Sequence, residues 1–357
     1  MSVDAVVAVR DPVRFSIRPP RRWWVAASLA LVGAAAAGVL IGPAGLPTRS
    51  VLLELASRLP LVHVHSGLSA TDKAIVWQIR MPRMVLGGLV GWTLAASGAG
   101  YQGVFRNPLA DPYLLGAAAG AGLGATLVIA YAPGSSGWPV DPVPAAAFVG
   151  AMAAVTVSYL VATAADRRAG TATIVLAGVA VAAFFTAVQT YVQQQHASSL
   201  HDVYTWILGR LTTSGWHDVW LVLPYVVVSS AVLLAHRRVL DVLSVGEAEA
   251  STLGVDTARA RLLVVGAATL GTAAVVAVSG LIGFVGIIVP HFVRLSAGGS
   301  YRRVLPLSMV GGAAFLILAD LIARTVVSPG EVPIGVVTAF FGAPFFVLVL
   351  RRRAARA

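Results

Sequence analysis

The chain has 357 residues, of which 57% are hydrophobic and only 11% are charged. Its mean hydropathy is +0.82, well above the value of a soluble globular domain. Apolar stretches of about 20 residues recur along the whole length, and each is long enough to cross a bilayer as a helix. These features exclude a soluble domain with one anchor, and the continuous runs lack the alternation of a membrane β-barrel. We therefore expect an all-α, polytopic membrane protein.

The apolar stretches predict about ten membrane-spanning helices in chain order. They cover residues 23–43, 83–104, 113–132, 141–164, 172–194, 217–236, 262–279, 281–296, 304–326 and 334–350. The first stretch follows RPPRRWW and is too long for the core of a signal peptide, so we expect a retained helix. The sequence thus predicts an N-terminal tail over 1–22, one transmembrane domain over 23–351, and a short tail over 352–357.

The basic residues predict the orientation of these spans. With ten spans both termini lie on one side of the membrane. Most of the 26 Lys and Arg residues fall in the two tails and in the loops on that side. Because cytoplasmic loops are enriched in Lys and Arg, both termini are expected in the cytoplasm. The same enrichment explains the net charge of +11, and we expect no nucleic-acid partner.

A polar segment, VGEAEASTLGVDTARAR (245–261), interrupts the apolar sequence between the sixth and seventh spans. Residues 247–250 favour helix, Gly254 can end it, and Asp256 can cap a second short helix. Such a cytoplasmic knob could fit a groove in a partner protein. An ordinary amphipathic loop helix on the membrane surface is the alternative.

The predicted spans are nearly free of ionisable groups. The exceptions are Asp320 and Arg324, which lie four positions apart on one helix and can pair. An ion-coupled secondary transporter of a small solute is one function that a polytopic membrane protein can have. Such a transporter usually keeps carboxylates within the membrane, so their near absence here argues against it. The chain also has no GxSG, HExxH or paired-aspartate motif for an intramembrane enzyme, no cysteine, and no Walker motif for binding a nucleotide.

Seven segments occur in an order that is specific to one family. They are IRMPR (79–83), GAGYQGVFRNPLADPYLLGAAAGAGLGA (98–125), WILGRL (206–211), GEAEASTLGV (246–255), SGLIGFVGIIVPHFVRL (279–295), LADLIAR (318–324) and EVPIGVVTAFFGAPFFVLVL (331–350). From about Trp24 to Arg351 the chain resembles the FecCD-type permeases, the membrane subunits of bacterial ABC importers for ferric siderophores, haem and cobalamin.

The resemblance implies the permease subunit of a type II ABC importer in the bacterial plasma (inner) membrane. Such a permease pairs with a second permease subunit, in a homodimer or with a paralogue, and with two separate ATPase subunits that use ATP and Mg. An extracytoplasmic binding protein delivers the iron chelate, with a ferric siderophore expected first, then haem, then cobalamin. This chain itself is expected to bind no cofactor and no metal, and to catalyse no reaction.

The resemblance also implies roles for particular residues. The segment 246–261 matches the coupling helices that contact the ATPase, with Glu247, Ser251, Leu253, Gly254 and Arg259 as the expected contact positions. Arg80, Arg83 and Arg324 match the arginines that meet acidic residues of the binding protein. Arginine suits this task because it stays charged and binds carboxylates bidentately. We expect exposed ion pairs there, with snorkelling toward headgroups as the alternative.

Polar uncharged residues mark a possible lining of the transport pathway between two permease subunits. Gln189, Thr190, Gln193 and Gln194 end the fifth span, where they could face water or form helix–helix hydrogen bonds. The segment 334–346 of the last span is another candidate for lining the pathway, because Gly342 and Pro344 loosen its helix. The histidines His63, His65, His196, His201 and His217 fall in predicted outer loops and are not expected to bind a metal. His291 is expected to be a packed structural residue.

Overall fold

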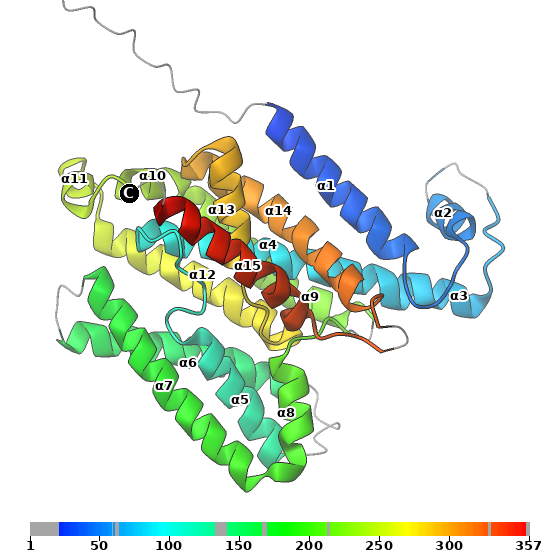
Figure 1. Cartoon of the computed structure of the whole chain (residues 1–357), viewed down its shortest axis with the longest axis horizontal. Coiled ribbons are helices and arrows are strands. Elements are labelled where there is room, and N and C mark those ends of the chain that lie inside the picture. The colour runs from blue at the N-terminus through cyan, green and yellow to red at the C-terminus, as the bar shows by residue number, and fades with distance from the viewer. Residues whose placement is uncertain are drawn as a thin grey trace, which may run out of the picture.

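The computed structural model describes residues 21–58, 60, 64–132, 141–165, 170–212, 215–327 and 330–354. Throughout these ranges the regular structure is helical, with no β-strand, so the all-α prediction is confirmed (Figure 1). His63, Arg167, Arg168, most of the N-terminal tail and residues 355–357 lie outside the described residues.

Each of the ten expected spans corresponds to a helix in the structure. These helices are α1 (Arg21–Leu40), α4 (Met81–Val104), α5 (Ala117–Tyr131), α6 (Pro142–Ala165), α7 (Thr171–Gln195), α9 (His217–Ala235), α12 (Thr257–Ser279), α13 (Val285–Ala297), α14 (Tyr301–Ala323) and α15 (Ile334–Ala354). Six of them, α1, α6, α7, α9, α12 and α14, are long and apolar enough to cross a membrane. Helices α5 and α13 and the segment 334–348 of α15 are apolar but shorter.

Short elements that the sequence did not predict connect the long helices. They are α2 (Thr48–Ala56), α3 (Ala70–Ala74), the π-helical turn η1 (Ile75–Arg80), the 3-10 turn η2 (Ala197–Ser199), α8 (Leu200–Ile207), α10 (Arg237–Leu243) and α11 (Glu247–Thr252). The turn η1 leads directly into α4. The break between α12 and α13 arises because Gly280 and Phe284 both have positive φ, 70° and 69°, which no continuous helix accommodates.

Helix α4 lies at the centre of the fold and packs against α9, α12, α13 and α14. Glycines allow these helices to approach closely. A Cβ placed on Gly91 would lie 2.1 Å from the carbonyl oxygen of Gly312 on α14, and one on Gly98 would lie 2.1 Å from that of Gly286 on α13. Small residues at crossing points are the usual way in which membrane helices pack. Any side chain at these positions would push the core helices apart.

Helices α5, α6 and α7 pack as a second group, and α12 joins this group to α4. The small-residue run 116–125 allows α5 to approach α6 closely. A Cβ on Gly120 would lie 2.1 Å from the carbonyl oxygen of Gly150 on α6, and one on Gly124 would lie 2.1 Å from that of Ala146. Close packing of α5 against α6 therefore depends on these two glycines.

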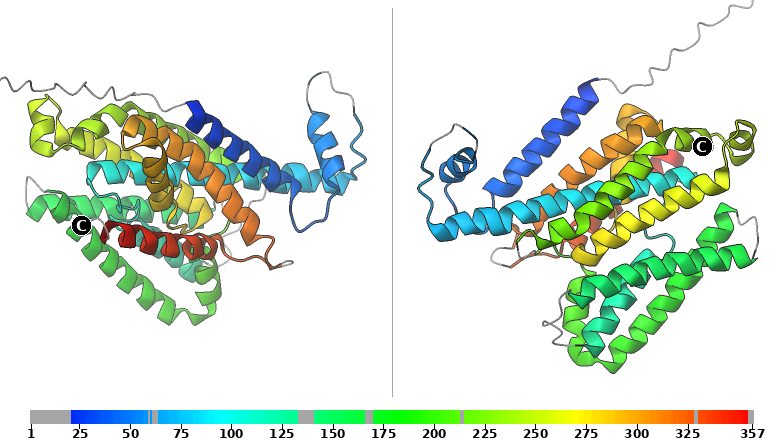
Figure 2. Two further views of the ribbon diagram at one scale, coloured as in Figure 1. Left: turned by 45° about the horizontal axis from the view of Figure 1, so that its top comes forward. Right: turned by 180° about the vertical axis from the view of Figure 1, so that it is seen from behind.

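The helices place two sets of short elements at opposite ends of the bundle. Helices α2 and α3 lie at one end, which we call the outer end, while α11 and the C-terminal end of α15 lie at the other, the inner end (Figures 1 and 2). The spans run between these ends. Residues that the sequence assigns to the two faces of the membrane are thus separated by the length of the bundle.

Candidate functional site

The inner end carries a projecting knob, which we define as residues 246–261 and which contains α11 and the first residues of α12. Helix α11 stops at Thr252, and Gly254 follows with a φ of +80°, a conformation that glycine adopts without strain. The amide of Val255 then donates to the carbonyl oxygen of Ala250 at 3.1 Å, and Ala250 is fully buried. These contacts fix the base of the turn at Ala250 and Val255, while Leu253 and Gly254 at its tip are exposed to solvent.

The second helix of the knob differs from the prediction. The carboxylate of Asp256 caps a helix, because its Oδ1 accepts from the amide of Arg259 at 2.9 Å. That helix is no separate short element, however. It is the first turn of the 23-residue α12, because the apolar sequence beyond Arg261 continues the helix without a break. A displacement of the knob would therefore be transmitted directly to α12, a long helix of the core.

The five expected ATPase-contact positions all lie in this knob. Leu253 is 70% exposed, which is unusual for a leucine outside the membrane-spanning part of the chain. Ser251, Gly254 and Arg259 are also exposed. Glu247 is partly covered and pairs with Arg261. The arrangement presents an apolar tip with polar flanks, which is suited to insertion into a partner's cleft.

A cluster of hydrogen bonds and an ion pair connects α10, the helix that precedes the knob, with α14. Asp241 on α10 accepts from the backbone amide of Tyr301 at 2.5 Å and from the hydroxyl of Ser300 at 2.8 Å. Arg302 lies 3.5 Å from the same carboxylate. Asp241 on α10 thus caps the N-terminus of α14, because Ser300, the residue just before α14, makes no capping hydrogen bond with its own side chain.

The cluster continues from α14 into the core. Arg294 on α13 donates to the hydroxyl of Tyr301 at 3.2 Å and to Oε1 of Gln102 on α4 at 2.5 Å. Gln102, fully buried, donates in turn to the carbonyl oxygens of Gly286 and Ala110 at 2.9 and 3.2 Å. Sequence reasoning missed this chain of contacts. The sequence contains a feature that could have indicated it, because Gln102 and Arg294 are polar residues within two of the seven segments of this otherwise apolar chain.

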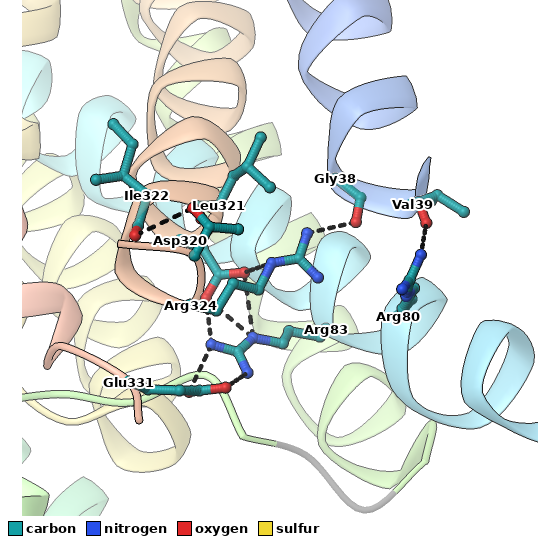
Figure 3. A network of polar contacts seen from close by, with 10 residues as sticks. Gly38, Val39, Arg80, Arg83, Asp320, Leu321, Ile322, Arg324 and Glu331 are labelled. Atoms are coloured by element: carbon teal, nitrogen blue, oxygen red, sulfur yellow. Dashed lines mark hydrogen bonds and ion pairs between the residues drawn. The ribbon is translucent and has the colours of Figure 1, made fainter. Parts of the chain in front are cut away.

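The outer end holds the three predicted docking arginines in one network with two carboxylates (Figure 3). Arg83, at the start of α4, lies between Asp320 of α14 and Glu331. Its Nη2 is 2.7 Å from Asp320 Oδ1, and its Nη1 is 2.7 Å from Glu331 Oε1. The guanidinium therefore bridges α4, α14 and the segment that leads into α15.

The other two arginines hold the end of α1. Arg80 donates to the carbonyl oxygens of Val39 and Leu40 at 2.9 and 3.1 Å, and also to that of Ala44. Arg324 donates to the carbonyl oxygen of Gly38 and lies 3.6 Å from Asp320 Oδ2, so the expected pairing of Asp320 with Arg324 is confirmed. Together they satisfy carbonyls that a helix leaves unpaired at its C-terminus.

The expectation that these three arginines are exposed is wrong. Arg80, Arg83 and Arg324 are only 3%, 8% and 4% exposed, and each is held by groups of its own chain. The physical reason is that their partners lie far away in sequence, on α1, on α14 and before α15. Glu331, which sequence reasoning did not single out, is the most accessible member of the network, with a side chain that is 39% exposed.

The expected pathway residues fall into two groups. Gln189 is buried and donates to the hydroxyl of Thr126 on α5 at 3.1 Å, so the helix–helix alternative holds for it. Gly342 is also buried, and a Cβ there would meet the ring of Phe284 at 2.3 Å, so it is a packing position within this subunit. Thr190 and Gln194 lie exposed on the surface of α7, and Gln193 is partly buried.

The described histidines show no metal-binding arrangement. Across the ranges given above, no three His, Asp or Glu side chains gather as metal ligands would. His291 is 9% exposed, and its ring meets that of Phe345 edge-on at 5.8 Å between centroids. That packing agrees with the expected structural role of His291.

Comparison with known proteins places the chain in a family. The model of the FecCD transport family matches residues 25–352. The cobalamin import system permease protein BtuC of Halobacterium salinarum is 40% identical over 94% of this chain and 97% of its own. The Fe(3+) dicitrate transport system permease protein FecD of Escherichia coli is 34% identical over 91% of this chain and 96% of its own.

A solved structure agrees with these relatives. It shows an inward-facing conformation of a metal-chelate type ABC transporter, and it matches 93% of this chain and 100% of its own with a TM-score of 0.79 and 28% identity. The chain belongs to the FecCD transport family. It is a multi-pass membrane permease of that family, and the resemblance drawn from its seven segments is confirmed.

Proposed function

We propose that this chain is the permease subunit of an ATP-driven ABC importer for a metal chelate. The observation that carries the proposal is the knob at the inner end, where Leu253 and Gly254 form an exposed tip on a base fixed by Ala250. An apolar side chain held in water by a rigid base needs a partner to cover it. The proposed partner is a separate ATPase subunit that uses ATP and Mg, and two such subunits serve a pair of permease subunits.

The cluster at the inner end supports the transmission of movement from that partner. Displacement of the knob acts on α12 directly, and on α14 and α13 through Asp241, Tyr301 and Arg294. Packed helices joined by polar contacts can carry such a coupling between two arrangements. The permease itself hydrolyses nothing in this proposal.

The cargo is a metal chelate delivered by a soluble binding protein at the outer end. From the sequence alone a ferric siderophore ranks first, then haem, then cobalamin. The 40% identity with a cobalamin permease over almost the whole chain supports placing cobalamin beside the siderophore in a first ligand screen. The cell membrane is the location proposed for the complex.

The three buried arginines act in this proposal by positioning the docking face. They fix the ends of α1, α4 and α14, and they leave the carboxylate of Glu331 accessible among them. The binding protein would then meet a face whose shape depends on Arg80, Arg83 and Arg324. For the pathway between two permease subunits, Thr190, Gln193 and Gln194 on α7 stay candidates because they are not packed away as Gln189 is.

The proposal is tested by co-purification of a separate ATPase subunit with the permease. Leu253→Asp should leave the permease folded in the membrane and abolish recovery of the ATPase. Val326→Asp is the matched control, because Val326 is 67% exposed and lies just after α14 at the outer end. Equal recovery of the ATPase with both variants would contradict the assignment of the knob.

A further inference from the structure

An open cavity of about 1010 Å³ lies at the outer end between α5, α6, α8, α9 and α12. It sits where α5 and α12 end and where α6 and α9 begin, at Ala132, Gly280, Asp141 and Asp218. Helix α8 stands against α5 (Figure 1), and its residues Asp202, Thr205 and Trp206 line one side of the cavity. No part of the proposed transport mechanism uses this cavity.

The mouth of the cavity is charged. Three carboxylates and a guanidinium line it, at Asp141, Asp202, Asp218 and Arg210, with His217 beside Asp218 at 3.3 Å. The backbone of Arg210 is fixed, because its amide donates to the carbonyl oxygen of Ser279 at 2.8 Å. Its exposed guanidinium makes no ion pair with any residue that the structure describes.

The depth of the cavity is apolar. Its wall there is made of Val128, Ile129, Phe148, Val149, Leu221 and Tyr225. The rings of Phe148 on α6 and Tyr225 on α9 meet at 5.5 Å between centroids. Both residues lie seven positions below the charged mouth on their helices, at Asp141 and Asp218, which corresponds to about 10 Å along an α-helix.

This change from charged to apolar follows the axis of the spans. Val149 is 64% exposed and Tyr225 is 38% exposed, so the apolar wall opens sideways onto the surface that faces the hydrocarbon of a bilayer. A water-soluble ligand would leave this wall uncovered. An amphiphile with a charged head at the mouth and a chain along α6 and α9 would cover both parts.

The charges select the kind of head group. Arg210 offers a site for an anionic oxygen, because guanidinium binds phosphate well. The surrounding carboxylates disfavour a ligand with net negative charge and favour one that also carries an ammonium group. A head group with one phosphate and one primary ammonium meets both requirements.

We propose that this cavity binds one phospholipid of the outer leaflet with a primary-ammonium head group, such as phosphatidylethanolamine. The phosphate lies at Arg210, the ammonium lies among Asp141, Asp202 and Asp218, and one acyl chain follows the wall formed by α6 and α9. The bound lipid fills the space between α6 and α9 at the outer end, where α8 rests against α5. This site does not depend on the nature of the transported cargo.

The test uses the complete permease, reconstituted with its ATPase where that co-purifies, and native mass spectrometry with defined lipids. Wild type should retain one phosphatidylethanolamine in preference to phosphatidylglycerol. Arg210→Gln should weaken this retention about tenfold, as expected for loss of one charge-assisted contact. Arg49→Gln is the matched control, because Arg49 is likewise exposed at the outer end, on α2.

A second variant separates a head-group site from a general effect on folding. The double variant Asp202→Asn with Asp218→Asn should lose the preference for phosphatidylethanolamine and gain retention of phosphatidylglycerol. Equal retention of both lipids by wild type would overturn the proposal. So would a preference that survives Arg210→Gln, or variants that change binding-protein affinity while lipid retention stays at the wild-type level.

Discussion

Arg83 and Asp320 form a buried ion pair across 237 positions of the chain, with the guanidinium 2.7 Å from the carboxylate. Their side chains are 9% and 5% exposed. The pair joins the first turn of α4, the central helix, to the last turn of α14, and Glu331 binds the same guanidinium from the segment before α15. The outer face of the permease is therefore fixed by charges that its own chain supplies.

Removal of Arg83 should destabilise the fold rather than merely weaken docking. Arg83→Met leaves Asp320 buried with one of its two cations gone, and breaking a buried pair costs about 3–5 kcal/mol. Thermal unfolding in detergent measures the loss. Adding Asp320→Asn to Arg83→Met should restore part of it, because the uncompensated charge disappears. A stability of Arg83→Met equal to that of wild type would show that the pair contributes nothing to the fold.

A large side chain at Gly254 should block the ATPase and leave the permease intact. Gly254 has a φ of +80°, and a Cβ there meets no described atom within 4 Å. Gly254→Trp should therefore cost only the strain of a left-handed residue, about 1–2 kcal/mol, while its ring obstructs the partner. Gly67 is the matched control, since it has a φ of +68° and the same open surroundings at the outer end. Recovery of the ATPase should fall for Gly254→Trp and persist for Gly67→Trp.

Asp241 should matter for transport more than for hydrolysis. Asp241→Ala removes the cap of α14, which should lower the stability of the fold by about 0.5–2 kcal/mol. It also removes the contact between α10, which precedes the knob, and α14. We expect the assembled complex to hydrolyse ATP at a rate close to wild type while uptake per ATP falls severalfold. Ser296→Ala is the control, because Ser296 is a partly buried residue of α13 whose hydroxyl donates to the carbonyl oxygen of Phe292 in the same helix. Parallel loss of hydrolysis and uptake would argue that Asp241 serves assembly alone.

Acid should release α2 from the bundle. Glu54 on α2 accepts from Ser66 at 2.7 Å and from the indole of Trp77 at 3.1 Å, and the hydrogen bond from Ser66 holds the pKa of this carboxyl below its usual value. A depressed pKa in the folded state means that Glu54 stabilises the fold above its unfolded pKa of about 4.3. The stabilisation is lost as the pH falls through the lower folded value.

Hydrogen exchange of α2, corrected for the intrinsic effect of pH, measures this release. The amides of α2 should stay protected in wild type at neutral pH and lose protection in acid. Glu54→Gln cannot ionise and should show weakened protection at both pH values. Protection that falls equally with pH in wild type and in Glu54→Gln would assign the effect to another group.

The sequence predicted the long helices well because their signal is local. Apolar runs of about 20 residues need no partner to be recognised, and the ten expected spans each find a helix. The boundary at Gly280 was also expected, because glycine-rich segments break helices. By contrast, α2, α8 and α10 are short and lack such a run, so only their packing against neighbours reveals them.

The candidate sites were predicted less completely, for a physical reason. The knob at 246–261 stands out because charge is rare in this chain, and its exposed tip needs no long-range contact. The arginines at the outer end were expected to be exposed, and they are buried. Their burial depends on Gly38, Val39 and Asp320, which lie far from them along the chain, and composition carries no information about that proximity.

If ATP hydrolysis by a partner drives import through this chain, uptake of the cargo into proteoliposomes must depend on ATP. The complex is reconstituted with the binding protein outside, and the accumulation of labelled cobalamin, haem or ferric siderophore is followed with ATP and Mg enclosed. Uptake of one of these chelates should require enclosed ATP, stop with vanadate, and continue when an ionophore collapses the proton gradient. Uptake that proceeds without ATP and stops on collapse of the gradient would contradict ATP-driven import and identify an ion-coupled carrier.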